Sequence, residues 1–252
     1  MFDLHMHTVW SDGKDTAEEM VQEAIRRGLE TVGISDHSSG DPVGMTLAAS
    51  RKYKAEIARL KEKYAGRIRV LCGLERDFLT DDFGEYDYTI GSVHWLKMPD
   101  GHSVSIDWTA EKQREGIRKY FGGDPYALAE AYYEAVSAVA EVTKCDIIGH
   151  FDLITKFNEQ DPLYDLRHPR YTAAWKRAAD VLLKTGKPFE INTGAMSRGY
   201  RTSPYPDREI CRYLLDHGGR LIFSSDAHSK EAVGYGFAEL AAEWPDPGKA
   251  PF

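Results

Sequence analysis

The sequence predicts an α/β fold in which seven parallel strands form a closed or nearly closed, distorted barrel. Short apolar runs alternate with helix-like segments, and this alternation is typical of parallel strands joined by crossover helices. Polar residues end most runs around the whole sheet, whereas an open doubly wound sheet would gather them mainly at one switch point. The link between the third and fourth runs, residues 80–88 (TDDFGEYDY), is too short for a full helix, so we expect a distorted barrel.

The expected strands are seven short runs rich in Ile, Val and Phe. Such runs, bounded by polar residues and glycines, are typical of buried strands in a parallel sheet. They lie near residues 2–7, 31–35, 68–74, 88–93, 145–149, 188–192 and 220–224.

The first expected helix has well-marked limits. Thr16 is suited to be its N-cap, and Glu19 three residues later completes a capping box. Apolar residues then follow at helical spacing until Gly28, which is a typical helix stop.

Four further helices are expected between the later strands. One runs from about Leu47 to Tyr64, and the next begins at Asp124–Pro125, where an N-cap coincides with a proline at the first helical position. Helices near 170–185 and 207–217 end at Gly186 and Gly218, as helix C-termini commonly do.

The chain length suits one barrel domain. With 252 residues it lies within the range that a single α/β barrel occupies. We therefore expect one domain over residues 1–252, in which the proline-containing tail at 244–252 is loosely held.

Composition excludes some classes of protein. The net charge of -8 disfavours a protein that binds many nucleic-acid phosphates, because such binding depends on clustered Lys and Arg. No apolar stretch is long enough to span a bilayer, so we expect no membrane insertion. A small anionic substrate held by metals remains compatible with this charge.

The cysteines and the N-terminus favour a cytoplasmic protein. Cys72, Cys145 and Cys211 are widely spaced and form no CxxC pair, so neither a disulfide framework nor a thiolate zinc site is expected. The chain begins almost directly with its first apolar run, which leaves no room for a signal peptide.

Six of the nine histidines and three carboxylates stand at the downstream ends of the apolar runs. Residues that end parallel strands face a common rim, so we expect these side chains to converge. Imidazoles and carboxylates are the ligands that a cluster of divalent metals requires. The candidates are His5, His7, Asp12, His37, Glu75, His94, His150, Asp226 and His228. The pattern indicates a metal-dependent hydrolase.

Single positions in this set have simpler explanations. A lone buried histidine is more often a hydrogen-bonded core residue than a metal ligand. Glu75 could pair with Arg76, and Asp226 could cap a helix. For the whole set these explanations weaken, because unpaired buried charges cost several kcal/mol each.

The strand pattern gives two further expectations. His5 and His7 are separated by one residue, so on a strand both rings point to one face and can bind one ion together. Asp36 and Asp152 are expected to accept the second N–H of a neighbouring imidazole and so orient it.

Other catalytic motifs are missing from the sequence. It contains no GxxxxGK[ST] phosphate loop, no GxGxxG after a strand, no HExxH helix and no GxSxG elbow. The three remaining histidines, His102, His168 and His217, lie in loops or at a helix end, and His217 needs no functional explanation there.

The motifs DLHMHTVWSDG, ISDH, GLE, GSVHWL, DIIGHFDLI, EINTG and SSDAH, in this order, closely resemble the polymerase and histidinol phosphatase (PHP) superfamily. The resemblance covers nearly the whole chain, and the segments IDWT, DPYALAEAYY and ITKFN resemble its stand-alone bacterial histidinol-phosphatase branch. It implies a distorted, TIM-like (β/α)7 barrel that holds up to three metal ions.

The resemblance also implies a division of the ligands. His5, His7, Glu75 and Asp226 would hold one ion, and Glu75 would bridge it to a second ion held by His94 and His150. Asp12, His37 and His228 would hold the third. A hydroxide that bridges the metals would attack phosphorus, so His5, His7, Glu75 and Asp226 would act in catalysis through it. Nitrogen and oxygen ligands are compatible with zinc, manganese or iron.

Three basic residues are candidates for binding phosphate. Arg198 is the first, because it follows the sixth strand and a guanidinium matches two phosphate oxygens. Arg201 is the alternative in the same loop, and Lys156 lies just beyond the fifth strand, where a solvated surface lysine is equally expected. Trp10, Trp95 and Trp108 lie in or near rim loops and could flank a substrate or cover the core.

The leading hypothesis is hydrolysis of L-histidinol phosphate in histidine biosynthesis. One alternative is another PHP-type phosphoesterase that acts on nucleotides or another small phosphate ester. A second is a non-catalytic metal-binding module that has kept the fold. The partner is expected to be a small phosphorylated substrate, and the sequence indicates no oligomeric state.

Overall fold

The computed structural model describes residues 1–244 and 250–252, and its centre is a parallel sheet of seven strands. The strands are joined in the order β1-β2-β3-β4-β7-β8-β9. Their bounds are β1 Phe2–Asp3, β2 Thr31–Ile34, β3 Arg69–Asp77, β4 Tyr88–Ser92, β7 Ile147–Ile148, β8 Phe189–Asn192 and β9 Leu221–Ser224. All seven predicted strands are present, and every neighbouring pair in this sheet is parallel.

The first and last strands of the sheet meet just beyond their ends. Met6 and Ala227 form a parallel bridge, in which the backbone N–H of His7 donates to the carbonyl oxygen of Ala227 at 2.8 Å. The N–H of Ala227 in turn donates to the carbonyl oxygen of His5 at 3.3 Å. The sheet is therefore a nearly closed barrel, as predicted, and structurally similar proteins described below share this fold.

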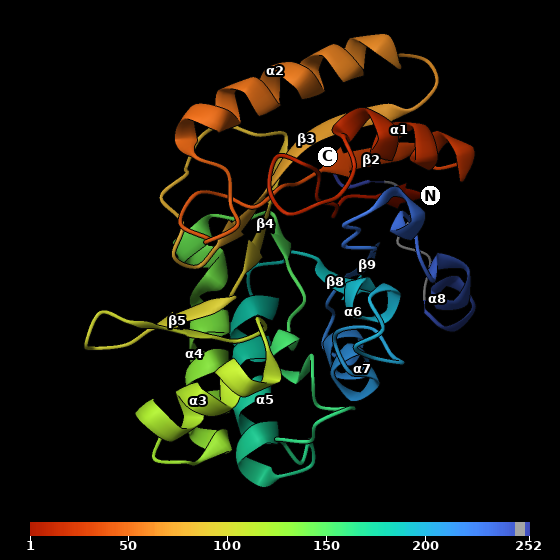
Figure 1. Ribbon diagram of the computed structural model, residues 1–252. Coiled ribbons are helices and arrows are strands. Elements are labelled where there is room, and N and C mark those ends of the chain that lie inside the picture. The colour runs from red at the N-terminus through yellow and green to blue at the C-terminus, as the bar shows by residue number, and fades with distance from the viewer. Residues whose placement is uncertain (245–249) are drawn as a thin grey trace.

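Helices surround the sheet (Figure 1). On one side lie α1 (Ala17–Arg26) and α2 (Leu47–Lys63), and on the other lie α3 (Ala110–Tyr120), α4 (Pro125–Thr143) and α5 (Pro169–Leu183). The chain also forms α6 (Gly194–Ser197), α7 (Arg208–Asp216) and α8 (Phe237–Glu243), with 3-10 turns at Leu153–Thr155 and Lys230–Ala232. None of the helices within residues 1–244 has both the length and the apolar character that crossing a bilayer requires.

The helix starts follow the predicted sequence signals. Thr16 caps α1: its hydroxyl accepts a hydrogen bond from the backbone N–H of Glu19, and the carboxylate of Glu19 accepts one from the backbone N–H of Thr16. Asp124 caps α4 in front of Pro125, also as predicted. No helix interrupts residues 80–87 between β3 and β4, which confirms the short link.

One antiparallel hairpin and three helices were not predicted. Strands β5 (Trp95–Lys97) and β6 (Ser103–Ser105) form the hairpin, and α3 follows it. Each strand has only three residues, and α3 is mostly polar with few buried side chains, so neither has a strong apolar signal. Helices α6 and α8 have only four and seven residues, which is too short for a helical repeat of apolar residues to stand out.

Large side chains fill the barrel at the end away from the rim. Tyr88 is buried, and its hydroxyl donates to the carbonyl oxygen of Leu4 at 2.5 Å. Gly33 and Gly73 make room for this ring, because a Cβ on either would lie within 2.5 Å of Tyr88 side-chain atoms. Phe252 stacks on Tyr88 with ring centroids 5.6 Å apart. The predicted loose tail at 244–252 falls partly on residues 245–249, which are outside the described residues.

Candidate metal centre

His5 and His7 follow β1 and place both rings inside the rim. Neither side chain is exposed, and their ring centroids are 5.1 Å apart. Nε2 of His5 lies 3.3 Å and Nε2 of His7 3.4 Å from the same oxygen of Glu75, Oε2. Both imidazoles therefore point to one carboxylate, as alternation along an extended segment predicts.

Glu75 lies at the centre of the cluster. It is part of β3, which continues two residues beyond it to Asp77. Its Oε1 is 2.9 Å from Nε2 of His150 and 3.5 Å from Nε2 of His94, and its Oε2 is 3.0 Å from Nδ1 of His37. Burial alone would raise the pKa of Glu75, but the surrounding imidazoles, led by His5, His37 and His94, hold it well below its usual value. The carboxylate is therefore ionised and can contact several groups at once.

Asp226 has an unusual backbone conformation that turns its side chain inward. Its φ of 48° is left-handed, which is uncommon outside glycine and is tolerated best by Asn and Asp. Oδ1 lies 3.3 Å from Nε2 of His7, and Nη2 of Arg198 donates to Oδ2 at 3.2 Å. Gly194 at the start of α6 leaves space for this carboxylate, since a Cβ there would lie 2.5 Å from Oδ2.

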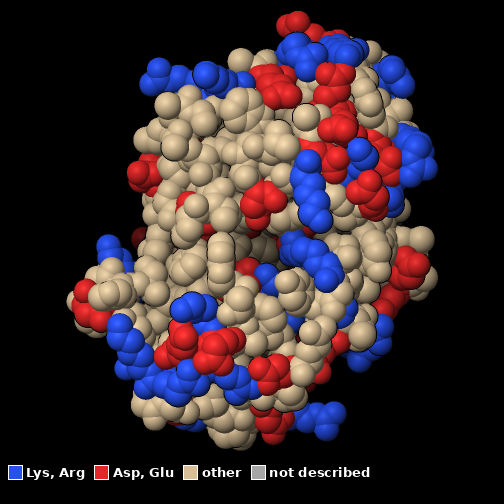
Figure 2. Space-filling model, viewed as in Figure 1, with Lys and Arg blue, Asp and Glu red and all other residues tan. Residues whose placement is uncertain are grey.

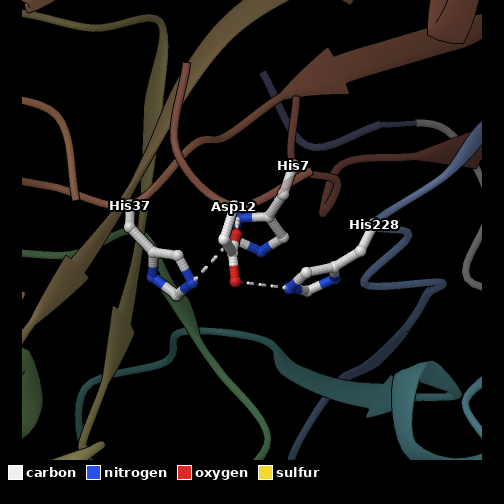
Figure 3. A group of neighbouring side chains, drawn as sticks. All are labelled: His7, Asp12, His37 and His228. Atoms are coloured by element: carbon white, nitrogen blue, oxygen red, sulfur yellow. Dashed lines mark ion pairs between the residues drawn. The ribbon is translucent and has the colours of Figure 1, made fainter. Parts of the chain in front are cut away.

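A second cluster lies on the outer side of His7 (Figure 3). Asp12 stands between His37 and His228, at 3.7 Å from Nε2 of His37 and 3.2 Å from Nε2 of His228. Its carboxylate is also 3.7 Å from Nδ1 of His7. Burial, together with the charges of His228 and His37, lowers the pKa of His7 to about 3, so its ring is neutral, which metal ligation requires.

Five buried ring nitrogens of the cluster lack hydrogen-bond partners among the described residues. They are Nε2 of His5, both ring nitrogens of His7, Nδ1 of His37 and Nδ1 of His94. A buried polar atom without a partner costs about 1–3 kcal/mol. Several of them lie within 3.5 Å of carboxylate oxygens without hydrogen-bond geometry. Nitrogens and oxygens that converge without bonding to one another suit divalent cations of the zinc, manganese or iron type.

Ligand atoms that lie within 4.8 Å of one another form five overlapping groups. The groups are His7, Asp12, His37 and His228; His5, His7 and Glu75; His5, His150 and Asp226; His37, Asp41 and His94; and Glu75, His94 and His150. All nine predicted ligands occur among them. Their division into three shells stays a prediction, and in the structure His7 also borders the Asp12 group.

Two carboxylates that sequence reasoning missed hold the histidines in place. Oε1 of Glu190 is 2.8 Å from Nδ1 of His5, and both side chains are fully buried. Oδ2 of Asp77 accepts the backbone N–H of His94 at 2.9 Å, and it also lies 3.2 Å from Nδ1 of that ring, without hydrogen-bond geometry. A charged residue inside a buried parallel strand, such as Glu190 in β8, is the signal that could have found the first of them.

The prediction that Asp36 and Asp152 orient imidazoles was wrong. Asp36 accepts hydrogen bonds from the backbone and hydroxyl of Thr8 and from the hydroxyl of Ser11, so it fixes the loop after His7. Asp152 accepts the backbone N–H of Asp207 and thereby ties the 3-10 turn to the start of α7. Consecutive residues of an extended segment point in opposite directions, which turns Asp36 away from the ring of His37.

The three basic candidates lie in different surroundings. Arg198 reaches the cluster, where its Nη1 is 2.6 Å from Nδ1 of His228. Lys156 lines the same cavity, but its ammonium donates to the carboxylate of Asp107 at 2.9 Å. Arg201 does not line this cavity: it is buried and lies 4.0 Å from Asp152 and 3.7 Å from Glu159.

The cluster opens into a cavity of about 290 Å³. Seven of the nine predicted ligands, all except His5 and His7, line this cavity. The rest of the wall includes Trp95, Asp107, Trp108, Lys156 and Arg198. Figure 2 shows this face of the molecule hollowed near its centre, with acidic and basic side chains beside the opening.

Trp10 does not line this cavity and donates its indole N–H to Glu56. His168 is the N-cap of α5 and His217 is the C-cap of α7, so both have structural roles.

The chain is similar in sequence to PHP domain proteins and to histidinol-phosphatases. The PHP domain family model matches residues 3–194. A Deinococcus radiodurans protein named probable histidinol-phosphatase is 31% identical over 98% of this chain and 93% of its own length. The histidinol-phosphatase of Bacillus subtilis is 28% identical, covering 93% of this chain and 96% of its own.

Solved structures share the fold. A candidate histidinol phosphatase of Listeria monocytogenes superposes with a TM-score of 0.81 at 24% identity, covering 95% of this chain and 99% of that one. The histidinol phosphate phosphatase of Lactococcus lactis, solved with zinc, L-histidinol and phosphate, gives 0.70 at 18% identity, covering 99% and 94%.

Proposed function

The chain belongs to the PHP domain family, and we propose that it hydrolyses L-histidinol phosphate to L-histidinol and phosphate. The observation that carries this proposal is the cluster of six imidazoles and three carboxylates, in which five buried ring nitrogens lack hydrogen-bond partners among the described residues. Relatives that cover more than nine-tenths of the chain are named histidinol-phosphatases, which supports this substrate. A role in histidine biosynthesis and a cytoplasmic location belong to the same proposal.

The cluster is suited to hold up to three divalent ions, with zinc, manganese and iron as candidates. We assign His5, His7, Glu75 and Asp226 to one ion, Glu75 with His94 and His150 to a second, and Asp12, His37 and His228 to a third. Bound there, such ions would lower the pKa of water and neutralise phosphoryl oxygens. Hydrolysis of a phosphate monoester needs acceleration of up to ~10²¹, while one general base supplies only about 10²–10⁴, so the side chains alone would not suffice.

The protein side chains position the reacting groups. Glu75 contacts imidazoles on both sides and so keeps the two neighbouring ligand groups together. Arg198 reaches the rim beside Asp226 and His228, where its guanidinium can bind two oxygens of the phosphate. Glu190 fixes the ring of His5, because a carboxylate accepts the proton on Nδ1 and leaves Nε2 free to bind a metal.

Phosphate release from matched substrates tests the proposal. Protein loaded with manganese or zinc should hydrolyse L-histidinol phosphate far faster than phenyl phosphate or nucleoside monophosphates. Treatment with a chelator should abolish this release, and added metal should restore it. Equal rates with all esters would leave a phosphoesterase but refute the assigned substrate.

Two variants separate an enzyme from a metal-binding module. His7→Ala and Asp226→Ala remove ligands from the centre and should abolish phosphate release and reduce bound metal. His217→Ala, at the end of α7, is the matched control and should change neither. Unchanged phosphate release in both ligand variants would refute the proposed metal cluster as the catalytic centre.

A further inference from the structure

The wall of the cavity has two chemically different parts. One part consists of Arg198 and the candidate metal ligands other than His5 and His7. The other lies on the β5–β6 hairpin, on the segment that follows it and on the segment around the Leu153–Thr155 turn. It includes Trp95, Asp107, Trp108, Leu153 and Lys156, and none of these five is a predicted metal ligand. A phosphate ester bound at the metal ligands would extend its alcohol part along this second wall.

Asp107 supplies a fixed negative charge on the second wall. Lys156 donates to Oδ2 of Asp107 at 2.9 Å and to its backbone carbonyl oxygen at 2.8 Å, so the carboxylate is held in one place. Burial would raise the pKa of Asp107, but the charges of Lys156 and His94 lower it to about 2. Within residues 1–244 and 250–252, no group donates a hydrogen bond to the second oxygen, Oδ1. That oxygen is available to a donor on a ligand.

Two indole rings flank the same wall. The ring centroids of Trp95 and Trp108 are 6.2 Å apart, with an angle of 45° between the ring planes. Trp108 is 55% exposed although it is a large aromatic residue beside a polar site. An indole face attracts organic cations, and a carboxylate forms short, strong hydrogen bonds with ammonium or imidazolium groups. Together they suit an alcohol that carries both an apolar part and a positive charge.

We propose that Asp107 selects phosphate esters whose alcohol part is an organic cation, and that Trp95 and Trp108 hold the apolar part of that group. The inference deepens the proposed function and rests on it, because L-histidinol carries an amine and an imidazole. It assigns to Lys156 the positioning of Asp107 and leaves the phosphate to Arg198. If the Asp107–Lys156 ion pair only stabilised the local structure, it would not discriminate between substrates with charged and with uncharged alcohol parts.

The test compares two esters of equal size. The kcat/KM of metal-loaded protein is measured for 4-aminobutyl phosphate, whose alcohol part carries an ammonium group, and for pentyl phosphate, whose alcohol part is uncharged. They are called the cationic and the neutral ester after these alcohol parts. Wild-type protein should prefer the cationic ester, and Asp107→Asn should lower this preference by about 10- to 100-fold, as expected for a hydrogen bond to a charged group. The effect should appear mainly in KM, with kcat for pentyl phosphate nearly unchanged.

A control and a second variant keep the result interpretable. Asp161→Asn removes a carboxylate that pairs with Arg114 away from the cavity and should leave the preference unchanged. Trp108→Leu alters an exposed side chain, so the variant should fold like the wild type and should bind both esters less tightly. Melting temperatures of all variants establish that they fold.

The outcomes separate this inference from the proposed function. A wild-type preference for the cationic ester that Asp107→Asn removes supports the inference, even if L-histidinol phosphate is a poor substrate. Equal losses for both esters in Asp107→Asn would overturn it, as would a wild-type protein that does not distinguish them, even if L-histidinol phosphate is hydrolysed well.

Discussion

Oε1 of Glu190 lies 2.8 Å from Nδ1 of His5, and neither side chain is exposed to solvent. Glu190 also accepts hydrogen bonds from the backbone N–H of His150 and the hydroxyl of Ser224. One carboxylate therefore connects two candidate metal ligands with the last strand of the sheet. Partners of this kind fix the tautomer and the orientation of a ligating imidazole.

Glu190→Gln should weaken metal binding. The amide can donate to Nδ1 of His5, which would favour the tautomer with its proton on Nε2, where the metal would bind. We expect a loss of about 10- to 100-fold in metal affinity, measured by competition with a chromophoric chelator. Glu243→Gln alters a surface ion pair with Arg208 and should bind metal like the wild type. Equal affinity in the two variants would contradict the role of Glu190.

Arg198→Lys should lower the affinity for phosphate although it keeps the positive charge. An ammonium cannot contact two oxygens as the guanidinium fork does. The expected loss in kcat/KM for L-histidinol phosphate is about 10- to 100-fold, with weaker inhibition by inorganic phosphate. Arg59→Lys, in a surface pair with Glu18, is the control. Unchanged inhibition by phosphate in Arg198→Lys would show that another group binds the phosphate.

Gly194→Ala should damage the site more than the fold. The new Cβ would lie 2.5 Å from Oδ2 and 2.7 Å from the Cβ of Asp226, so the carboxylate must move. We expect less bound metal and slower phosphate release in a protein that still folds. Gly186→Ala places a side chain at φ 66° in open space beyond α5, so it should cost roughly 1 kcal/mol of stability without changing metal content. Full metal content in Gly194→Ala would refute the steric argument.

The three thiols should be unreactive in the folded protein. Burial raises the pKa of Cys72 to about 12, with the carboxylate of Asp87 adding to the effect, and burial also raises the pKa of Cys145 and Cys211. At pH 8 only about one Cys72 side chain in 10⁴ is then a thiolate, the reactive form. Titration with a disulfide reagent should detect three thiols in guanidinium chloride and almost none without it. Rapid reaction of one thiol in the folded protein would contradict this burial.

The sequence predicted the seven strands because each has an apolar run long enough to stand out. It missed the β5–β6 hairpin, whose strands have three residues each and contain Ser, Lys and Trp rather than a continuous apolar run. That omission matters for function, because the hairpin and the segment after it carry Trp95, Asp107 and Trp108 to the cavity.

In the site, the position of residues at strand ends predicted which candidate ligands lie close together. It did not predict which carboxylates contact the histidines among them. Glu190 lies inside β8 rather than after it, so a search of strand ends misses it. Asp36 was placed beside the wrong partner because neighbours in sequence are not neighbours across a barrel: its contacts are Thr8 and Ser11, from another strand end. Such contacts depend on the pairing of distant strands, which a single sequence does not specify.

The meeting of Met6 with Ala227 has a consequence for how the protein is made. His5 and His7 precede Asp226 and His228 by more than two hundred residues in the sequence. At roughly 5–20 residues per second, a ribosome would need on the order of 10 to 40 s to supply the second pair. A nascent chain therefore holds an incomplete set of ligands until Asp226 and His228 have been added. A polypeptide that ends before Asp226 would lack these two ligands and should not retain the full set of ions.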